Sequence, residues 1–125
     1  MSDSGSRLIF VVEDDDGVRQ STQALLEASG FRVRTFANAE EMLAAGTASE
    51  AGCIVLDHHL SGMTGIELIE TLRAQGLQVP AIMVTSDGTK LGVRAAHAGV
   101  TAVLRKPLAA DALEEWLHRL MPKAG

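Results

Sequence analysis

The sequence predicts an α/β protein built on a doubly wound, five-stranded parallel sheet with helices on both faces. Two observations predict this fold class. Short apolar runs rich in branched residues alternate with amphipathic stretches five times along the chain, and the connections are short, with no repeat or low-complexity segment between them. Alternating units of this kind give right-handed crossovers, and therefore a parallel sheet that helices cover on both sides.

Length and composition indicate one compact domain spanning residues 1–125, with 1–6 and 122–125 expected as flexible ends. Hydrophobic residues make up 46% of the chain and aromatic residues only 3%, so the core must be mainly aliphatic. The single cysteine, Cys53, excludes an internal disulfide and is typical of a reducing compartment. Without a signal segment or an apolar run of membrane-spanning length, we expect a cytoplasmic protein that makes no membrane contact.

The charge balance argues against direct contact with nucleic acid. The formal net charge is −5, from 16 acidic and 11 basic side chains, and no cluster of Lys and Arg occurs anywhere. Binding to a phosphate backbone requires a basic face that releases counterions. We therefore expect this domain to make no direct contact with nucleic acid.

The first two predicted units occupy residues 8–45. Residues 8–12 (LIFVV) form an apolar run typical of a strand buried on both faces. A helix is expected over 17–29, with Asp16 as its N-cap and Val18, Thr22, Leu25 and Leu26 at helical spacing. Residues 31–36 alternate as a strand does. Asn38 followed by Glu41 then predicts a capped short helix through 42–43.

The remaining three units follow the same pattern. Residues 53–56 (CIVL) form a buried strand, and Thr64 with Glu67 has the spacing of a capping box at the start of the next helix. Residues 80–84 predict a strand, followed by an Ala-rich helix that ends near 98. The last strand is expected at 101–104. An apolar stripe on the closing helix packs in the core or at an interface: Leu113, Trp116, Leu117 and Leu120.

Side chains that follow the strands gather at one edge of such a sheet, where ligands of open α/β folds bind. These residues are acidic, basic or hydrogen-bonding: Glu13, Asp14, Asp15, Asp16, Asp57, His58, His59, Thr85, Ser86, Asp87, Arg105 and Lys106. Clustered carboxylates repel one another, and a hard divalent cation such as Mg²⁺, which prefers oxygen ligands, removes that repulsion. A phosphoryl group on Asp57 would then be neutralised by the metal and Lys106.

These residues closely resemble the receiver domain of two-component response regulators, over nearly the whole chain. The resemblance lies in four segments: the acidic pair Glu13-Asp14 after the first strand, Asp57 with the Gly-Met-Thr-Gly loop at 62–65, Thr85-Ser86, and Lys106-Pro107. It implies the flavodoxin-like strand order 2-1-3-4-5, which is the order of CheY-like proteins.

The resemblance also implies a metal site for Mg²⁺. Asp14 would bind the ion directly, Glu13 would act through water, and Asp57 would be both a ligand and the phosphoryl acceptor. The backbone carbonyl of His59 would supply a further ligand.

Two further residues are expected to contact the phosphoryl group. Thr85 would hydrogen-bond it and Lys106 would form an ion pair with it, so that Thr85, Lys106 and Asp57 form the reacting set. The Lys106-Pro107 bond is a candidate for cis geometry, since X-Pro bonds are the main place where cis occurs.

Three positions depart from the family pattern. Glu13 stands where Asp is more usual, Leu60-Ser61 stands where Met-Pro is typical, and Val103 stands where many members have Tyr or Phe. The loop after Asp57 is therefore expected to be less constrained. The coupling of a threonine to an inward-turning aromatic ring is in doubt here, and the signal is expected to pass through backbone shifts.

The implied function is a phosphorylation switch, not a turnover enzyme. A sensor histidine kinase or a histidine phosphotransfer protein would donate the phosphoryl group, which would change an interaction surface around the fourth and fifth β-α units. His59 and Asp87 occupy positions that tune the lifetime of the phosphoryl group in this family. Whether phosphorylation causes homodimerisation, and whether the chain acts alone or within a longer regulator, stays open.

Other functions agree less well with these residues. His58-His59 could bind a transition metal, but neighbouring residues of an extended segment point apart, which favours ordinary loop residues. An aspartyl-phosphate phosphatase needs a second acid two residues after its nucleophile, where this chain has His59. A flavin carrier needs a hydroxyl-rich phosphate loop after the first strand, where this chain has four acids. A receiver that acts only as a docking surface has no need for the full acid and lysine set.

Overall fold

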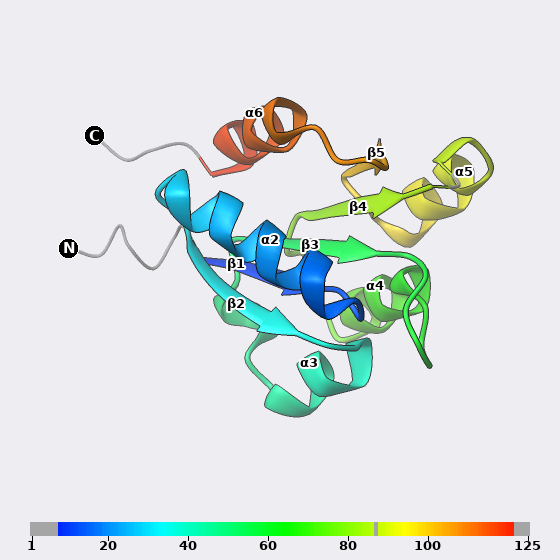
Figure 1. Ribbon diagram of the computed structural model, residues 1–125. Helices are drawn as coiled ribbons and strands as arrows, with labels where there is room; N and C mark the ends of the chain where they lie inside the picture. The colour runs from blue at the N-terminus through cyan, green and yellow to red at the C-terminus, as the bar shows by residue number, and fades with distance from the viewer. Residues whose placement is uncertain (1–7, 87, 122–125) are drawn as a thin grey trace.

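The computed structural model describes residues 8–86 and 88–121, and in this part of the chain five parallel strands form one sheet (Figure 1). The sheet order is β2-β1-β3-β4-β5, which confirms the expected fold class and order. The strands are β1 (Leu8–Val12), β2 (Arg32–Phe36), β3 (Cys53–Asp57), β4 (Ala81–Thr85) and β5 (Ala102–Arg105). The expectations for 1–6, 122–125 and Asp87 concern residues outside the described part.

Helices cover both faces of the sheet (Figure 1). The helices of the described residues are α2 (Asp16–Ala28), α3 (Ala39–Ala45), α4 (Gly65–Ala74), α5 (Gly88–Ala98) and α6 (Ala110–Leu120), with a 3-10 turn at Ala48–Glu50. Side chains of α2 and α6 pack on one face, and those of α3, α4 and α5 pack on the other. The sheet is therefore the middle layer of three.

The strand sequences explain the two cores, because successive side chains of a strand point to opposite faces. Ile9 and Val11 pack with Leu26 and Leu113 beneath α2 and α6. Phe10 belongs to the opposite core, with the buried residues of α3, α4 and α5. Every residue of β1, β3 and β4 is buried, as their continuous apolar runs predict.

The start of α2 differs by one residue from the prediction. Asp15 is the N-cap, because its Oδ1 accepts a hydrogen bond from the Val18 amide at 2.9 Å, whereas Asp16 is the first helical residue and contacts Arg19. Val18, expected on the inner face of the helix, is 42% exposed. The acidic run thus divides into a buried residue at position 13 and a helix cap two residues later.

Two other predicted caps occur in the structure. The Asn38 side chain accepts from the Glu41 amide at 2.7 Å, although the Glu41 carboxylate accepts from Ala37 and not from Asn38. Thr64 and Glu67 form the complete capping box at the start of α4. These caps fix where α3 and α4 begin, next to the carboxyl edge of the sheet.

Trp116 and Cys53 both belong to the core between the sheet and the α2 and α6 layer. Trp116 is partly buried against the core beneath α6, and the Arg119 guanidinium lies 5.3 Å from the centre of its ring, so this side chain lies at the edge of the core. Cys53 is fully buried, and burial raises the pKa of its thiol to about 12, as suits a packing residue. No helix in the described part is long and apolar enough to cross a membrane.

Candidate functional site

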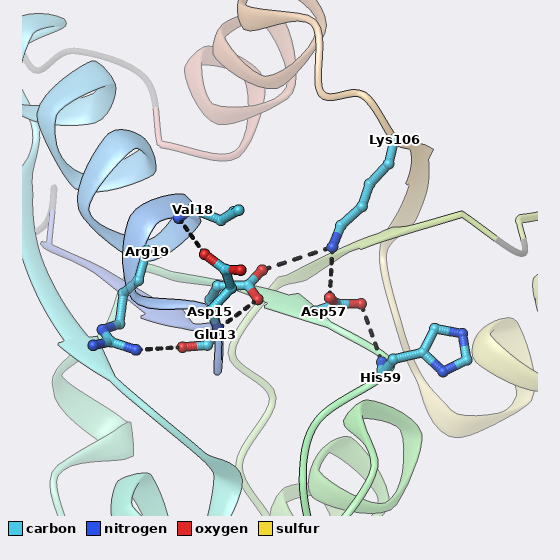
Figure 2. A network of polar contacts seen from close by, with 7 residues as sticks. All are labelled: Glu13, Asp15, Val18, Arg19, Asp57, His59 and Lys106. Carbon is cyan, nitrogen blue, oxygen red and sulfur yellow. Dashed lines mark hydrogen bonds and ion pairs between the residues drawn. The ribbon is translucent and has the colours of Figure 1, made fainter.

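Three side chains from the ends of different strands meet at the carboxyl edge of the sheet (Figure 2). Lys106 follows β5, and its Nζ lies 2.6 Å from Oδ2 of Asp57, the last residue of β3. The same Nζ lies 3.8 Å from Oε1 of Glu13, which follows β1. The convergence predicted from residues far apart in the sequence is therefore present.

Backbone contacts fix the position of Glu13. Its amide donates to the carbonyl of Phe36 at 3.1 Å, and its own carbonyl accepts from the Arg19 guanidinium at 2.8 Å. The Glu13 side chain accepts from the amide of Asp15 at 3.1 Å and is almost fully buried. The longer side chain at this position thus bends back on its own loop while one oxygen faces Lys106.

Asp57 is buried, and the loop that follows holds its carboxylate. The amide of His59 donates to Asp57 Oδ1 at 3.0 Å, while Lys106 contacts the other oxygen, Oδ2. Figure 2 shows the His59 ring pointing away from Asp57 and Lys106. His58 is buried although it was expected to be an ordinary loop residue, and the two histidine rings lie 5.1 Å apart. The backbone of His59, and not its ring, faces the acceptor.

The backbone of Lys106 is anchored to the neighbouring strand. Its amide donates to the carbonyl of Thr85 at 3.1 Å, and the Lys106-Pro107 peptide bond is cis, as expected. Thr85 ends β4 next to Arg105 of β5 and is fully buried. Thr85 therefore lies at the same edge of the sheet as Asp57, one strand away.

The electrostatics of the site show how closely its charges are coupled. Burial raises the pKa of the Glu13 carboxyl, and the charge of Asp57 adds to that rise, while the Asp15 amide and Lys106 oppose it. Burial lowers the pKa of Lys106, but its hydrogen bond to Asp57 and the charges of Asp57, Glu13 and Asp14 outweigh this, so that its pKa is raised overall. The site holds excess negative charge that one ammonium only partly neutralises.

A largely apolar cavity of about 260 Å³ lies beside these charges. Its apolar wall includes Val11, Val18, Val55, Val84 and Leu108, and its polar rim includes Glu13, Asp57 and Lys106. Such a wall weakens the screening of the neighbouring charges by water. This apolar wall explains why the Glu13 carboxyl, although at the edge of the sheet, has the raised pKa of a buried group.

The residues predicted for the site are therefore placed as follows. Glu13, Asp57 and Lys106 are in mutual contact, and the His59 backbone joins them. Asp14 is exposed, and its neighbouring carboxyl adds a minor contribution to the raised pKa of Glu13. One contributor was missed: Arg19, whose bond to the Glu13 carbonyl had no signal in the sequence beyond its position one turn into the helix.

The donor set fits Mg²⁺ better than a transition metal. In the described residues, no three His, Cys, Asp or Glu side chains are grouped closely enough to hold a metal ion by themselves. Mg²⁺ needs fewer protein ligands, because it keeps several water molecules and takes one or two carboxylates. Glu13, Asp14 and Asp57 offer hard oxygen atoms where negative charge is in excess.

The fold and this site together define a class: an open doubly wound α/β domain with acids and a lysine at the carboxyl edge of its sheet. The family model described as the response regulator receiver domain matches residues 9–118. The chain therefore belongs to this family and is a receiver domain of the two-component response regulators. Receiver domains of this family bind Mg²⁺ and are phosphorylated by histidine kinases.

Curated relatives agree with this assignment. The chain is 39% identical over 100 residues to the transcriptional regulatory protein FixJ of Azorhizobium caulinodans, a match that covers 79% of this chain and 47% of FixJ. It is 35% identical over 121 residues to the C4-dicarboxylate transport transcriptional regulatory protein DctD of Rhizobium meliloti, which covers 96% of this chain and 26% of DctD. The chain thus spans less than half the length of these two relatives.

A solved structure shows the same fold at full domain length. The CheY-like response regulator receiver domain protein of Methanospirillum hungatei superposes with a TM-score of 0.82 at 31% identity, covering 91% of this chain and 93% of that one. The sheet order and the two helical layers described above are therefore those of CheY-like receiver domains.

Proposed function

We propose that this domain is a phosphorylation switch in which Asp57 accepts a phosphoryl group from a phosphohistidine. The donor would be a sensor histidine kinase or a histidine phosphotransfer protein. The observation that supports this most directly is the contact of Lys106 Nζ with Asp57 Oδ2 at 2.6 Å, beside the buried carboxylate of Glu13. An acceptor, a cation and a carboxylate for the metal are then adjacent.

The chain's own residues account for the transfer step. A carboxylate oxygen of Asp57 attacks the phosphorus, the phosphorus–nitrogen bond to the donor histidine breaks, and the electron pair leaves with the imidazole. The His59 amide orients Asp57 through Oδ1. Lys106 neutralises the phosphoryl oxygens once it exchanges its Asp57 partner for them.

Mg²⁺, held by Glu13, Asp14, Asp57 and the His59 carbonyl, would supply the further positive charge that the transferred group needs. Glu13 fits this role through its burial and its raised pKa, because a bound cation offsets the repulsion between Glu13 and Asp57. Water-mediated binding suits the bent conformation in which Glu13 also accepts from the Asp15 amide.

The output would come from the fourth and fifth β-α units. Thr85 is buried at the end of β4 and its carbonyl holds the Lys106 amide, so movement of either residue toward a phosphoryl group pulls on both strands. Val103 of β5 is partly buried against the core and has no ring to turn inward. The signal would therefore pass through the backbone of the β4–α5 segment to a protein partner.

Several properties of the whole protein belong to the same proposal. The domain would act as a signalling partner and not as a turnover enzyme, in the cytoplasm and without contacting nucleic acid itself. The relatives named above are transcriptional regulators that extend beyond the matched region. Homodimerisation on phosphorylation is tested by light scattering with and without beryllium fluoride, which mimics the phosphoryl group.

Incubation with acetyl phosphate and Mg²⁺, followed by intact-mass measurement, tests the acceptor function. We expect one phosphate adduct on the wild-type protein, none without Mg²⁺, and none on Asp57→Asn. Asp111→Asn, an exposed acid on α6, is the matched control and should form the adduct at the wild-type rate. An adduct that persists in Asp57→Asn would contradict the proposal.

A further inference from the structure

The loop between β3 and α4, residues 58–64, is closed at its base by backbone hydrogen bonds. The carbonyl of His58 accepts from the amides of both Leu60 and Gly65, each at 3.0 Å. Leu60 is buried in the core beneath α3 and α4, which anchors the same end of the loop. These contacts hold the base of the loop, and the partly buried Met63 side chain packs against the same core near its tip.

A side chain from another element holds the tip. Oε2 of Glu40, in the first turn of α3, accepts a hydrogen bond from the Met63 amide at 2.9 Å. Gly62 has φ of 82°, and a Cβ atom there would lie 2.7 Å from the same carboxylate oxygen. Only glycine therefore combines this backbone conformation with room for the Glu40 carboxylate.

Glu40 acts from a fixed position. The residues beside and after it, Ala39 and Met42, are fully buried, and the Asn38 side chain caps the helix that contains all three. Figure 1 shows the loop after β3 turning toward the start of α3 before it enters α4. A carboxylate on a well-packed helix can therefore add a fixed hydrogen-bond partner for the backbone at the tip of this loop.

The loop sequence itself supplies little stiffness. Residues 58–64 (HHLSGMT) contain no proline, so no fixed φ angle limits the backbone of this loop. The same loop carries the His59 amide that orients Asp57. Restraint of the tip therefore bears directly on the geometry of the acceptor.

We propose that Glu40 is a positioning residue for the acceptor site. By holding the Met63 amide, it adds a restraint from α3 to residues 58–64, a segment without proline, and so keeps the backbone of His59 in place. The inference rests on the proposed Mg²⁺ site, because the His59 carbonyl is one of its ligands. Glu40 touches neither the metal nor the phosphoryl group and acts only through the loop.

Amide hydrogen exchange of the metal-free protein tests the contact itself. In Glu40→Ala, we expect the Met63 amide to exchange about three- to tenfold faster, as the loss of one hydrogen bond at an exposed site implies. Glu40→Gln keeps an acceptor oxygen and should exchange within about twofold of wild type. Glu70→Ala removes an equal charge from the groove that Glu40 and Glu70 both line, and should leave the Met63 amide unchanged.

Calorimetric titration with Mg²⁺ tests the consequence. We expect Glu40→Ala to bind Mg²⁺ about three- to tenfold more weakly, with Glu40→Gln and Glu70→Ala within about twofold of wild type. Equal weakening in Glu40→Ala and Glu70→Ala would assign the effect to net charge and overturn the inference. So would faster exchange of Met63 with unchanged Mg²⁺ affinity.

The outcomes also separate this inference from the proposed function. If wild type binds Mg²⁺ and Glu40→Ala matches it in both measurements, the positioning role is wrong and the proposed function stands. If wild type binds no Mg²⁺, the metal part of the proposed function fails and the positioning role fails with it. Gly62→Ala provides a second variant, because its Cβ would displace the carboxylate, and it should weaken Mg²⁺ binding as Glu40→Ala does.

Discussion

Lys106 Nζ and Asp57 Oδ2 lie 2.6 Å apart, although 49 positions separate the two residues in the sequence. The contact joins the ends of β3 and β5, which lie on either side of β4 in the sheet. It places the Lys106 ammonium on the carboxylate that we propose as the acceptor. The more distant contact of the same Nζ with Glu13 places one ammonium beside two buried acids.

Removing that ammonium should destabilise the metal-free protein. Lys106→Met leaves Asp57 and Glu13 without their cation, and we expect a loss of about 1–2 kcal/mol, reduced from the fully buried case because the Lys106 side chain is one-third exposed. Urea unfolding measures the change, and saturating Mg²⁺ should restore part of it. Arg105→Met, which removes an exposed charge one residue earlier, should change stability by less than about 0.5 kcal/mol. Equal effects of the two variants would contradict the account.

The raised pKa of Glu13 predicts the direction of a pH effect. A carboxyl whose pKa is higher in the folded state binds its proton more readily there, so its ionised form costs stability at neutral pH, and that cost disappears as pH falls through the raised pKa toward 4.5. Glu13→Gln should therefore make the metal-free protein more stable at neutral pH. Its advantage should shrink as the pH falls toward 4.5. Urea midpoints of both proteins across this range measure it, and a variant less stable than wild type at neutral pH would refute it.

Gly65 should not tolerate a side chain. A Cβ atom there would lie 2.7 Å from the backbone oxygen of Asp57 and 2.9 Å from Cα of His58. Neither backbone atom can move without disturbing the loop between β3 and α4. We expect Gly65→Ala to lose at least about 2 kcal/mol of unfolding free energy. Gly92→Ala in α5, where nothing lies within 4 Å, should instead gain about 0.5–1 kcal/mol from helix propensity. Thermal unfolding of both variants distinguishes a close approach from a general intolerance of alanine.

The thiol of Cys53 should be inert in the native protein. Burial raises its pKa to about 12, so the reactive thiolate is scarce at neutral pH and the sulfur is out of contact with water. A chromogenic disulfide reagent should label one thiol per chain in denaturant and react at least about a hundredfold more slowly without it. Rapid labelling of the native protein would show that β3 opens far more readily than its buried position implies.

The spacing of apolar residues along the sequence predicted the positions of the strands. Buried runs such as 8–12 and 53–56 gave strands in the expected places, because a strand covered on both faces needs apolar residues at every position. The convergence of Glu13, Asp57 and Lys106 also followed from the sequence, since parallel strands bring their carboxyl ends to one edge. The N-cap of α2 was predicted at Asp16 but is Asp15, because two successive aspartates can both cap a helix and the sequence does not distinguish them.

Contacts between residues far apart in the sequence could not be predicted from the spacing of apolar residues. Glu40 lies 23 positions from Met63, and nothing in its local pattern distinguishes it from any exposed acid in the first turn of a helix. The contact depends on where α3 and the loop after β3 lie relative to each other, which only the packed fold determines. The burial of His58 has the same origin, since its exposure depends on how the loop closes onto the carboxyl edge of the sheet.

The most direct test of the central claim is to trap the acyl phosphate chemically. After incubation with acetyl phosphate and Mg²⁺, borohydride reduces an aspartyl phosphate to homoserine, and peptide mass spectrometry then locates the altered residue. The account predicts homoserine at position 57 and nowhere else, with none formed when Mg²⁺ is omitted. Homoserine at Glu13, Asp14 or any other acid with position 57 unmodified would contradict it.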